Sequence, residues 1–557
     1  MTRTGYVLGL NLGFHESSAA LLRDGELRWL VEQERLSRRK RALGQSPADA
    51  ARACLAAEGI ALEAVDTIAI GWDFSRTPLG RSRRFTDEGL RQLLFPEAHP
   101  DHMPAVRWVP HHLAHAACAF HSSGEPEAAV LVVDGAGETQ ATSLGRADAG
   151  GVELVREWPM AQSLGFFYAS ASKWAGLGEW GAGKLMGLAA YGRPRPGLPL
   201  RAVDGGYVLD LDVEPEPPAD GRRPRPPMMS FPPAYEAAVA AGFAKHFPYA
   251  ARTGEDTISY ADLAASVQLA TEEAMLALAT EARRVMDVPA LVLAGGVAMN
   301  CSMVGRLVRE GPFERVFVPP VPTDAGVALG GALAVASESA RFSPTRIDHP
   351  YWSLAVGLES ACGAARAAGL VARQLPGEEL ASEAAGALAA GKIVAVARGR
   401  AEIGQRALGA RSIVADPRDR RNHERLNVIK GREMWRPVAP SILREHVEEL
   451  IEGRIGHPAR FMLAASPVRP AQRTRVPAVT HVDGSARPHA VDRSTNPFYW
   501  SLIERFRQLT GVPAVVNTSF NLAGEPIVCS AADAVSTFTR AEGIDLLVLD
   551  DLLVTRA

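Results

Sequence analysis

The chain has 557 residues, of which 47% are hydrophobic and 22% charged, and its 60 Lys and Arg nearly balance 63 Asp and Glu. A chain of this length exceeds what one hydrophobic core usually supports, so we expect two large domains or three smaller ones. The formal net charge of −3 gives no case for a nucleic-acid or membrane-surface partner.

The first predicted elements are a strand, a turn and a second strand. An apolar run ends at Leu10, a turn follows over residues 11–13, and a second apolar run covers residues 19–22. The same order recurs at 129–133 and 139–143. Two such units far apart in one chain predict an internally duplicated nucleotide-binding domain. Helical patterns alternate with short apolar runs between them, which favours an α/β architecture.

The next segments predict an insertion, a long helix and a domain boundary. A Pro-rich stretch near 214–233 can form neither helix nor central strand, so we expect a solvated insertion. Ser259 is the predicted N-cap of a long amphipathic helix that leads to a buried strand at 290–294. Periodicity is lost near 340–355. We therefore predict domains at 1–350 and 351–557, the second including a strand at 393–397.

Two histidines suggest a metal site. His111 and His115 open an Ala-rich helical pattern, and their i,i+4 spacing places both imidazoles on one helix face. Asp324, in the sequence PTDAG, is the best candidate for a third ligand, because a His/His/carboxylate set leaves coordination positions open for a substrate. The spacing alone is equally compatible with histidines that cap a helix and bond to backbone. The pattern lacks the Glu of HExxH, so a zinc protease is a poor match.

Three further segments of the first domain could bring a ligand close to the backbone. His15 lies in GFHESS after the first strand, where a tight turn suits a phosphate or acyl group, and its imidazole could act as a general base. Lys184 lies among small residues in GKLMGLAAYG, and LAGGVAMN ends a buried strand where α/β domains often bind a base or ribose. The alternatives are a solvated turn histidine, a packed helix with a surface lysine, and a plain strand-to-helix turn.

The second predicted domain carries cations interleaved with Gly, Pro and apolar residues, unlike the Glu/Lys mixture of a solvated helix face. They occur in GQRALGARS and KGREMWRP, and are followed by DGSARP and NTSFN. Together they predict an anion pocket with guanidinium forks for phosphate oxygens and Asn and Ser side chains for a planar polar group. An unrelated set of surface arginines is the alternative.

Taken in order, these segments resemble the O-carbamoyltransferase family, which includes nodulation-factor, cephamycin and tobramycin carbamoyltransferases. The resemblance spans nearly the whole chain through HHLAHA, VVDGAGE, GKLMGLAAYG, LAGGVAMN, PTDAGVALG, GQRALGARSI, IKGREMWRPVAPSI, DGSARP and VVNTSFNLAGEPIV. It implies a first domain of the tRNA threonylcarbamoyl-transferase fold, a duplicated member of the actin-like ATPase superfamily. It also implies a second, YrdC-like α/β domain. Gln405, where the family usually has Pro, and Pro488-His489, where a Gln is common, depart from the pattern.

The resemblance also implies a reaction in two stages. The second domain would convert carbamoyl phosphate and ATP, with Mg²⁺, into carbamoyl-adenylate, while an iron-type divalent ion on His111, His115 and Asp324 would serve transfer in the first domain. His15 would deprotonate the acceptor hydroxyl. The residues carried over for the carbamoyl-adenylate in the first domain are Gly13, Asp134, Gly137, Lys184, Gly295, Gly296 and Asn300. Those carried over for ATP and carbamoyl phosphate in the second domain are Arg406, Arg411, Lys430, Arg436, Arg487, Asn517 and Ser519.

Other functions fit the sequence less well than carbamoyl transfer. A tRNA-modifying threonylcarbamoyl transferase would need a basic surface, which the net charge does not support. If the protein were an actin-like sugar kinase or an ATP-driven regulator, the candidate metal triad and the second domain would have no explanation. A non-catalytic nucleotide-binding partner is a poor fit, because the chain carries candidate metal ligands and a candidate general base. The five scattered cysteines and the absence of a signal core or transmembrane stretch predict a cytoplasmic protein. The expected acceptor is a neutral hydroxylated natural product, in antibiotic tailoring; the sequence leaves the oligomeric state open.

Overall fold

The computed structural model describes residues 5–77, 82–211, 233–247, 257–339, 342 and 346–556. The predicted Pro-rich insertion therefore lies outside the described residues, apart from its last position. Among the residues that are described, no helix combines the length and apolar character needed to cross a membrane.

The N-terminal part contains two five-stranded sheets with the same topology. Their strand orders are β3-β2-β1-β4-β5 and β8-β7-β6-β11-β12, and in both sheets the central strand pairs antiparallel with one neighbour and parallel with the other. This repetition confirms the predicted duplication and is the sheet order of an actin-like ATPase fold. The strands of the two sheets are β1 (Tyr6–Asn11), β2 (Ser18–Arg23), β3 (Glu26–Glu32), β4 (Thr67–Ile70), β5 (Ala105–Trp108), β6 (Ala128–Val133), β7 (Gln140–Asp148), β8 (Gly151–Pro159), β11 (Ala290–Ala294) and β12 (Arg315–Phe317).

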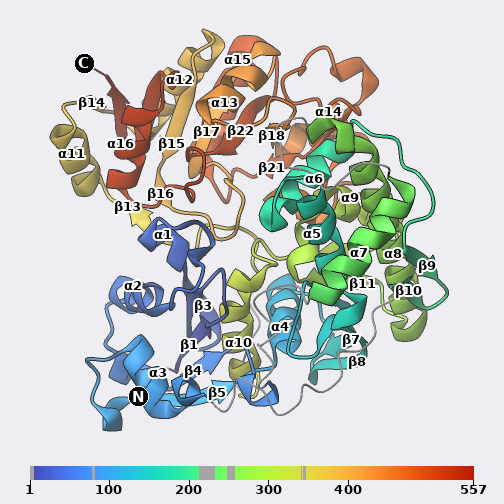
Figure 1. The fold of residues 1–557 in the computed structure, drawn as a ribbon. Coiled ribbons are helices and arrows are strands. Elements are labelled where there is room, and N and C mark those ends of the chain that lie inside the picture. Colours follow the sequence, from blue (N-terminus) through green and yellow to red (C-terminus); the bar gives the residue numbers. More distant parts are fainter. Residues whose placement is uncertain are drawn as a thin grey trace.

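Two helices, α4 (His111–Ser123) and α10 (Val327–Ala336), pack against each other between these sheets (Figure 1). The approach is very close: a Cβ atom on Gly330 would lie 1.8 Å from the carbonyl oxygen of Ala114, and one on Gly9 would lie 1.8 Å from that of Ala328. Only glycine leaves room for backbone at these positions. This packing brings the start of α4 and the turn before α10 to the same place between the two sheets.

Further helices cover the outer faces of the two sheets. The longest, α8 (Ala261–Met286), contacts α5, α6 and α9 as well as the hairpin of β9 and β10. The predicted N-cap at Ser259 is wrong by one residue: Tyr260 is the N-cap, because residues 257–260 form a 3-10 turn that runs into the helix. The remaining elements are α1 (Gln33–Ser37), α2 (Ala48–Glu58), α3 (Asp87–Leu94), α5 (Leu164–Trp174), α6 (Ala182–Ala189), α7 (Pro233–His246), α9 (Cys301–Glu310), β9 (Leu200–Val203) and β10 (Gly206–Leu209).

The C-terminal part is built on one eight-stranded mixed sheet, ordered β14-β24-β23-β15-β17-β22-β18-β21. The predicted strand at 393–397 is β15 (Val394–Ala397), a fully buried central strand. The domain limits remain a prediction. The strands are β14 (Val371–Gln374), β17 (Arg411–Ala415), β18 (Ala439–Leu443), β21 (His489–Val491), β22 (Ala514–Ser519), β23 (Leu546–Leu549) and β24 (Leu552–Thr555), with the short pairs β13 (Ala355–Val356) and β16 (Gly399–Arg400), and β19 (Ser466–Pro467) and β20 (Ser485–Ala486). The helices are α11 (Leu358–Ala367), α12 (Gly377–Ala389), α13 (Arg421–Ile429), α14 (Val447–Leu450), α15 (Pro497–Thr510) and α16 (Ala531–Arg540).

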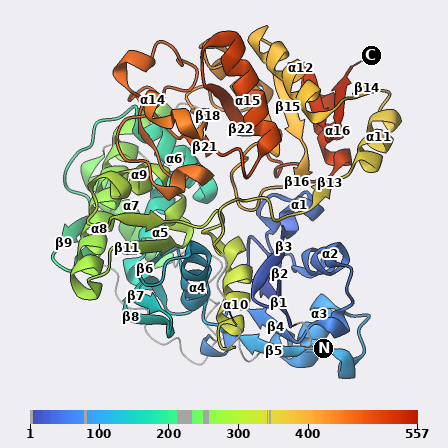
Figure 2. The same ribbon diagram turned by 180° about the vertical axis from the view of Figure 1, so that it is seen from behind.

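The C-terminal sheet lies against both halves of the N-terminal part (Figure 2). Helix α1 approaches it from the first half, where Arg35 donates a hydrogen bond to the carbonyl oxygen of Gly404. Helix α6 approaches it from the second half, where Lys184 pairs with Glu433 at 2.8 Å. The three parts therefore enclose a shared space.

Candidate functional site

Four side chains converge at the start of α4, with ligand atoms that all lie within 4.8 Å of one another: His111, His115, Asp134 and Asp324. The Nε2 atoms of His111 and His115 are 3.2 Å apart, and each lies 3.4 Å from Oδ2 of Asp134. Oδ1 of Asp324 lies 3.6 Å from the first imidazole and 3.5 Å from the second. All four residues are buried. Two imidazoles and two carboxylates directed at one point form a donor set for a divalent first-row metal ion.

Neighbouring groups fix the orientation of His111. Its Nδ1 lies 3.2 Å from the carbonyl oxygen of Gly71, which can only accept, so in the neutral ring Nδ1 carries the proton and Nε2 faces the cluster. Its backbone N–H donates to Glu138, and the indole of Trp72 stacks on its ring with 3.7 Å between centroids. The ring is therefore held before any ion binds.

The charges of the cluster are suited to a cation. Burial lowers the pKa of His111, but the carboxylates of Asp324 and Asp134 outweigh it and raise that pKa to about 10. Burial likewise opposes ionisation of Asp134, yet hydrogen bonds from the two imidazoles hold its pKa well below the usual value. Protons on the imidazoles thus neutralise the buried carboxylates. A divalent ion displaces such protons on binding, so these residues fit one.

The predicted general base lies beside this cluster. Nδ1 of His15 is 3.8 Å from Oδ2 of Asp324, and 32% of the His15 side chain is exposed. The amide of Asn11 donates to the backbone carbonyls of His15 and Glu16, which holds the turn against β1. One side of the imidazole is therefore open to solvent, while Nδ1 faces the cluster.

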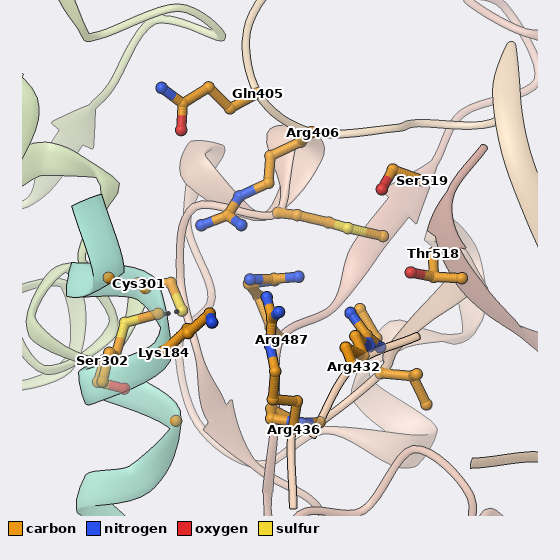
Figure 3. Close-up of a pocket in the computed structure, with 18 of the residues that line it drawn as sticks. Lys184, Cys301, Ser302, Gln405, Arg406, Arg432, Arg436, Arg487, Thr518 and Ser519 are labelled. Atoms are coloured by element: carbon orange, nitrogen blue, oxygen red, sulfur yellow. Dashed lines mark hydrogen bonds between the residues drawn. The ribbon is translucent and has the colours of Figure 1, made fainter. Parts of the chain in front are cut away.

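A cavity of about 1010 Å³ lies between the N-terminal and C-terminal parts. Four guanidinium groups extend into it, those of Arg406, Arg432, Arg436 and Arg487, opposite Lys184 (Figure 3). Burial, together with repulsion between these neighbouring cations, lowers the pKa of Arg406 to about 9 and that of Arg432 to about 9.

These cations have little compensation from the protein. The Nε atoms of Arg406 and Arg487 are buried and bond to no group in the part of the chain that the structure describes. Glu433 approaches Arg436, at 3.7 Å, but it is shared with Lys184. Buried cations that repel one another and keep unused donors form a binding site for a multiply charged anion such as a phosphate.

Most of the residues predicted for the second domain line this cavity. They are Arg406, Arg436, Arg487, Asn517 and Ser519, and Lys184 of the first domain joins them. The side-chain Oδ1 of Asn517 is buried without a hydrogen-bond partner among the described residues, while its Nδ2 donates to Ala407 and Ser441. Its free oxygen is thus available to a donor on a ligand.

Two of the residues predicted for ATP and carbamoyl phosphate do not line the cavity. Arg411 is fully buried at the start of β17. Its guanidinium donates to five backbone carbonyls, those of Cys529, Arg398, Ala410, Leu354 and Gly399. Lys430 donates all its hydrogen bonds to Ser519 and Asn521. The structure therefore places both residues behind the cavity, where they organise its loops, because their hydrogen-bond donors are already bonded to protein oxygens.

The small residues predicted to cradle a nucleotide in the first domain lie around the metal cluster. A Cβ on Gly295, whose φ is +91°, would meet the carbonyl oxygen of Val133 at 2.2 Å, and one on Gly137 would meet the ring of His112 at 2.8 Å. Gly13 donates its N–H to Asn11. These glycines therefore serve close packing; a nucleotide contact remains a prediction for them.

Asp134 and Asn300 have roles that differ from those expected. Oδ2 of Asp134 faces the imidazoles and its Oδ1 accepts the N–H of Gly296, so a residue predicted for the nucleotide is a candidate fourth metal ligand. Asn300 caps α9 through Met303, and its amide pairs with Gln268. Its side chain therefore supports the helix rather than facing the cavity.

Sequence reasoning left part of the cavity wall unassigned. Arg432 stands in the cationic segment KGREMWRP but was not among the residues carried over. The wall formed by Glu16, Arg35, Lys40 and Arg41 was missed altogether. The basic run RLSRRKR was a local signal for it, but only the fold shows that this run faces the second domain.

Comparisons with known proteins add independent findings. The Carbamoyltransferase N-terminus model matches residues 93–333, and the Carbamoyltransferase C-terminus model matches residues 385–556. Nodulation protein NolNO of Sinorhizobium fredii (strain NBRC 101917 / NGR234) is 35% identical over 98% of this chain and 80% of its own length. The 3'-hydroxymethylcephem-O-carbamoyltransferase of Amycolatopsis lactamdurans is 36% identical over 52% of this chain and 53% of its own. Among solved structures, full-length HypF in the phosphate- and nucleotide-bound form aligns with a TM-score of 0.36 at 13% identity, over 61% of this chain and 56% of that one.

Proposed function

The chain belongs to the carbamoyltransferase family, and from this premise we propose that it forms carbamoyl-adenylate from carbamoyl phosphate and ATP and transfers the carbamoyl group to a hydroxyl of a natural product. The observation that carries the proposal is the cationic cavity. It joins the arginines of the C-terminal motifs to a wall, Glu16 and Trp180, that adjoins His15 and the candidate metal cluster.

We place the first stage at the guanidinium groups. Hydrolysis of carbamoyl phosphate releases phosphate and leaves carbamate; a carbamate oxygen then attacks the α-phosphorus of ATP, and pyrophosphate leaves as carbamoyl-adenylate forms. Arg406, Arg436 and Arg487 would hold the phosphate oxygens through this stage, with Asn517 accepting from a donor on the substrate. Mg²⁺ would accompany ATP.

We place the second stage, transfer of the carbamoyl group, beside His15 and the candidate metal cluster. His15 takes the proton of the acceptor hydroxyl while the hydroxyl oxygen bonds to the carbamoyl carbon. The bond between the carbamoyl carbon and the phosphate oxygen then breaks, and AMP leaves. His111, His115, Asp134 and Asp324 would hold a divalent ion, which we propose to be iron, and that ion would supply Lewis-acid chemistry to this stage. Nδ1 of His15 lies 3.8 Å from Oδ2 of Asp324, so the base stands next to that site.

The two-stage reaction would explain why residues of both parts of the chain line one cavity. Carbamate is a poor electrophile, and joining it to AMP supplies a good leaving group. Keeping the labile adenylate inside one protein limits its hydrolysis. For the acceptor we propose a neutral hydroxylated compound such as a macrolide or glycoside, modified during antibiotic biosynthesis.

One incubation tests the first stage. The protein is mixed with ATP, carbamoyl phosphate, Mg²⁺ and Fe²⁺ without any acceptor, and nucleotides and pyrophosphate are separated and quantified. We expect carbamoyl-adenylate and pyrophosphate in equal amounts. Absence of both in a folded, metal-loaded sample would overturn the assignment of the cationic cavity.

His15→Asn separates the stages. This variant should form carbamoyl-adenylate at the wild-type rate and transfer no carbamoyl group when 3'-hydroxymethylcephem, a macrolide and tobramycin are offered in parallel with wild type. Transfer at the wild-type rate would remove His15 from the mechanism.

A further inference from the structure

A continuous series of contacts connects His15 with the C-terminal part of the chain. The ring of His15 packs edge-on against the indole of Trp180, with 5.0 Å between centroids. The guanidinium of Arg41 lies over the same indole at 4.3 Å and donates to Oε1 of Glu16 at 3.1 Å. That same oxygen accepts from the side-chain amide of Gln405 at 2.7 Å. We call Gln405, Glu16, Arg41 and Trp180 the strap.

The backbone at the strap is unusual. Glu16 and Arg41 both have positive φ values, of 54° and 65°, although neither is glycine. They are joined by a 2.6 Å hydrogen bond from the N–H of Glu16 to the carbonyl of Arg41. Left-handed conformations of this kind cost free energy and persist where the surroundings impose them, often at functional sites. Here they aim the Glu16 carboxylate away from His15 and toward the C-terminal part.

His15 itself has few restraints. Its Nδ1 is buried without a hydrogen-bond partner among the described residues, and its contact with Asp324, at 3.8 Å, is long. Trp180 belongs to a turn flanked by Gly178 and Gly181 and is 42% exposed, so the turn does not fix the indole by itself. Arg41 supplies the restraint from one side of the ring.

We propose that Trp180 is a positioning residue for His15, and that Gln405 sets its position from the C-terminal part through Glu16 and Arg41. The inference rests on the proposed role of His15. Gln405 precedes Arg406, whose guanidinium lies in the cationic cavity, so the placement of the base depends on the loop that holds the phosphate. The side-chain amide of Gln405 is essential to this link, because it donates the hydrogen bond to Glu16.

The test measures the placement of His15 without any acceptor. Diethyl pyrocarbonate labels accessible histidines, and the labelling rate of the peptide containing His15 is followed by mass spectrometry in wild type, Trp180→Ala, Trp180→Phe, Gln405→Ala and the double variant Trp180→Ala/Gln405→Ala. Trp180→Ala should raise the rate several-fold and Trp180→Phe should restore it. Gln405→Ala should also raise it, although Gln405 does not touch His15. The double variant should label no faster than Trp180→Ala, because both changes act through one path.

Two results would overturn the inference: wild-type labelling of His15 in Gln405→Ala, or a double variant whose acceleration is the product of the two single effects. Leu509→Ala, an exposed change on α15, is the control for substitution in general. Carbamoyl-adenylate formation is measured in the same samples, with wild type and Leu509→Ala as the references. Its absence in wild type would reject the proposed function, whereas the labelling rates would still decide whether the strap holds His15.

Discussion

The carboxylate of Asp134 faces two ways, with Oδ2 toward the imidazoles of His111 and His115 and Oδ1 bonded to the N–H of Gly296. Asp134→Asn keeps the shape of the side chain and removes its negative charge. We expect metal affinity to fall roughly 10- to 100-fold, because a neutral amide is a weaker ligand. Metal content after dialysis against graded chelator, read by elemental analysis, measures the change.

Glu138→Gln is the matched control for this prediction. Glu138 accepts the backbone N–H groups of His111 and Asp73 through one oxygen, and a glutamine carbonyl can accept both. Its metal affinity should therefore stay close to that of wild type. Equal retention by both variants and wild type would remove Asp134 from the ligand set.

Arg406 and Arg411 stand five residues apart in one motif, and they should respond oppositely to replacement by methionine. Arg406 is repelled by neighbouring cations, so its loss should leave the unfolding free energy unchanged or raise it while weakening phosphate binding. Arg411→Met removes the donor of five buried backbone carbonyls and should lower the unfolding free energy markedly, because an unsatisfied buried acceptor costs roughly 1–3 kcal/mol. Denaturant unfolding and calorimetric titration with carbamoyl phosphate test both; equal stability losses would contradict the distinction.

The same arginines show what a sequence can tell at this scale. The motif identified a cationic segment, but whether a guanidinium meets ligand or backbone depends on loops brought in from Leu354 and Cys529. The pairing of His111 with His115 could be predicted from the sequence, because the two residues are one helix turn apart. The role of Asp134 as a candidate metal ligand could not be predicted, because a carboxylate that follows a buried strand can bind either a ribose or a metal ion.

At the scale of elements, the geometry of the candidate metal cluster depends on how closely α10 approaches α4. Gly330→Ala would set a methyl group 1.8 Å from the backbone oxygen of Ala114, and no side-chain rotation relieves that overlap. We expect a loss of roughly 3 kcal/mol in unfolding free energy, with lower metal affinity as α4 shifts. Thermal and denaturant unfolding, with metal titration, measure the two effects.

A second glycine provides the comparison. Gly386 lies within α12, and a Cβ there would meet nothing within 4 Å. Gly386→Ala should raise stability by roughly 0.5–1 kcal/mol and leave metal affinity unchanged, since alanine is the better helix former. If Gly330→Ala proved as harmless, the tight packing of α4 on α10 would be refuted.

Elements with a strong period were predictable, whereas their ends and contacts were not. The strand that became β11 and the apolar stripe of α8 follow from local pattern. The start of α8 was misplaced because a preceding 3-10 turn carries the chain into the helix. The small residues of α10 follow Asp324 in the sequence, but their purpose becomes clear only when the backbone of α4 is placed against them.

At the scale of the whole molecule, buried histidines should make the fold sensitive to acid. Burial lowers the pKa of His489 to about 3 and that of His121 to about 4, from an ordinary value of 6.5. Between pH 6.5 and about 4, these two histidines bind protons in the unfolded chain but stay neutral in the folded chain. The unfolding free energy therefore falls as the pH falls. Each histidine contributes a slope of about 1.4 kcal/mol per pH unit.

His489→Gln should remove one such slope. Unfolding free energies measured from pH 6.5 to 4.5 should therefore decline less steeply in this variant than in wild type. His99→Gln, a change of a surface histidine, should leave the slope as it is. An unchanged slope in His489→Gln would mean that His489 accepts its proton in the folded chain.

The duplicated architecture was visible in the sequence because a strand-and-turn pattern occurs twice. The two-part organisation was visible because a helical pattern restarts after the chain loses its periodicity. The shared cavity was not, because its wall combines segments hundreds of residues apart. Arg38 illustrates this: it donates to the carbonyls of Pro526 and Ile527 and lies 3.5 Å from Asp533, yet in sequence it is one cation in a basic run.

Arg38 therefore offers a test of how far the cavity depends on contact between the two parts. Pro526 and Ile527 line the cavity, and Arg38→Ala would leave their carbonyls without this donor. Loss of these charge-assisted bonds, worth roughly 1.5–3 kcal/mol each, should loosen the wall and raise the Kd for carbamoyl phosphate about tenfold. Arg39→Ala, at the exposed neighbouring position, is the matched control and should bind as wild type does. Because the arginines of the cavity stay in place in both variants, weaker binding in Arg38→Ala alone would show that the N-terminal part shapes the phosphate site, and equal binding in both would show that the C-terminal part holds it unaided.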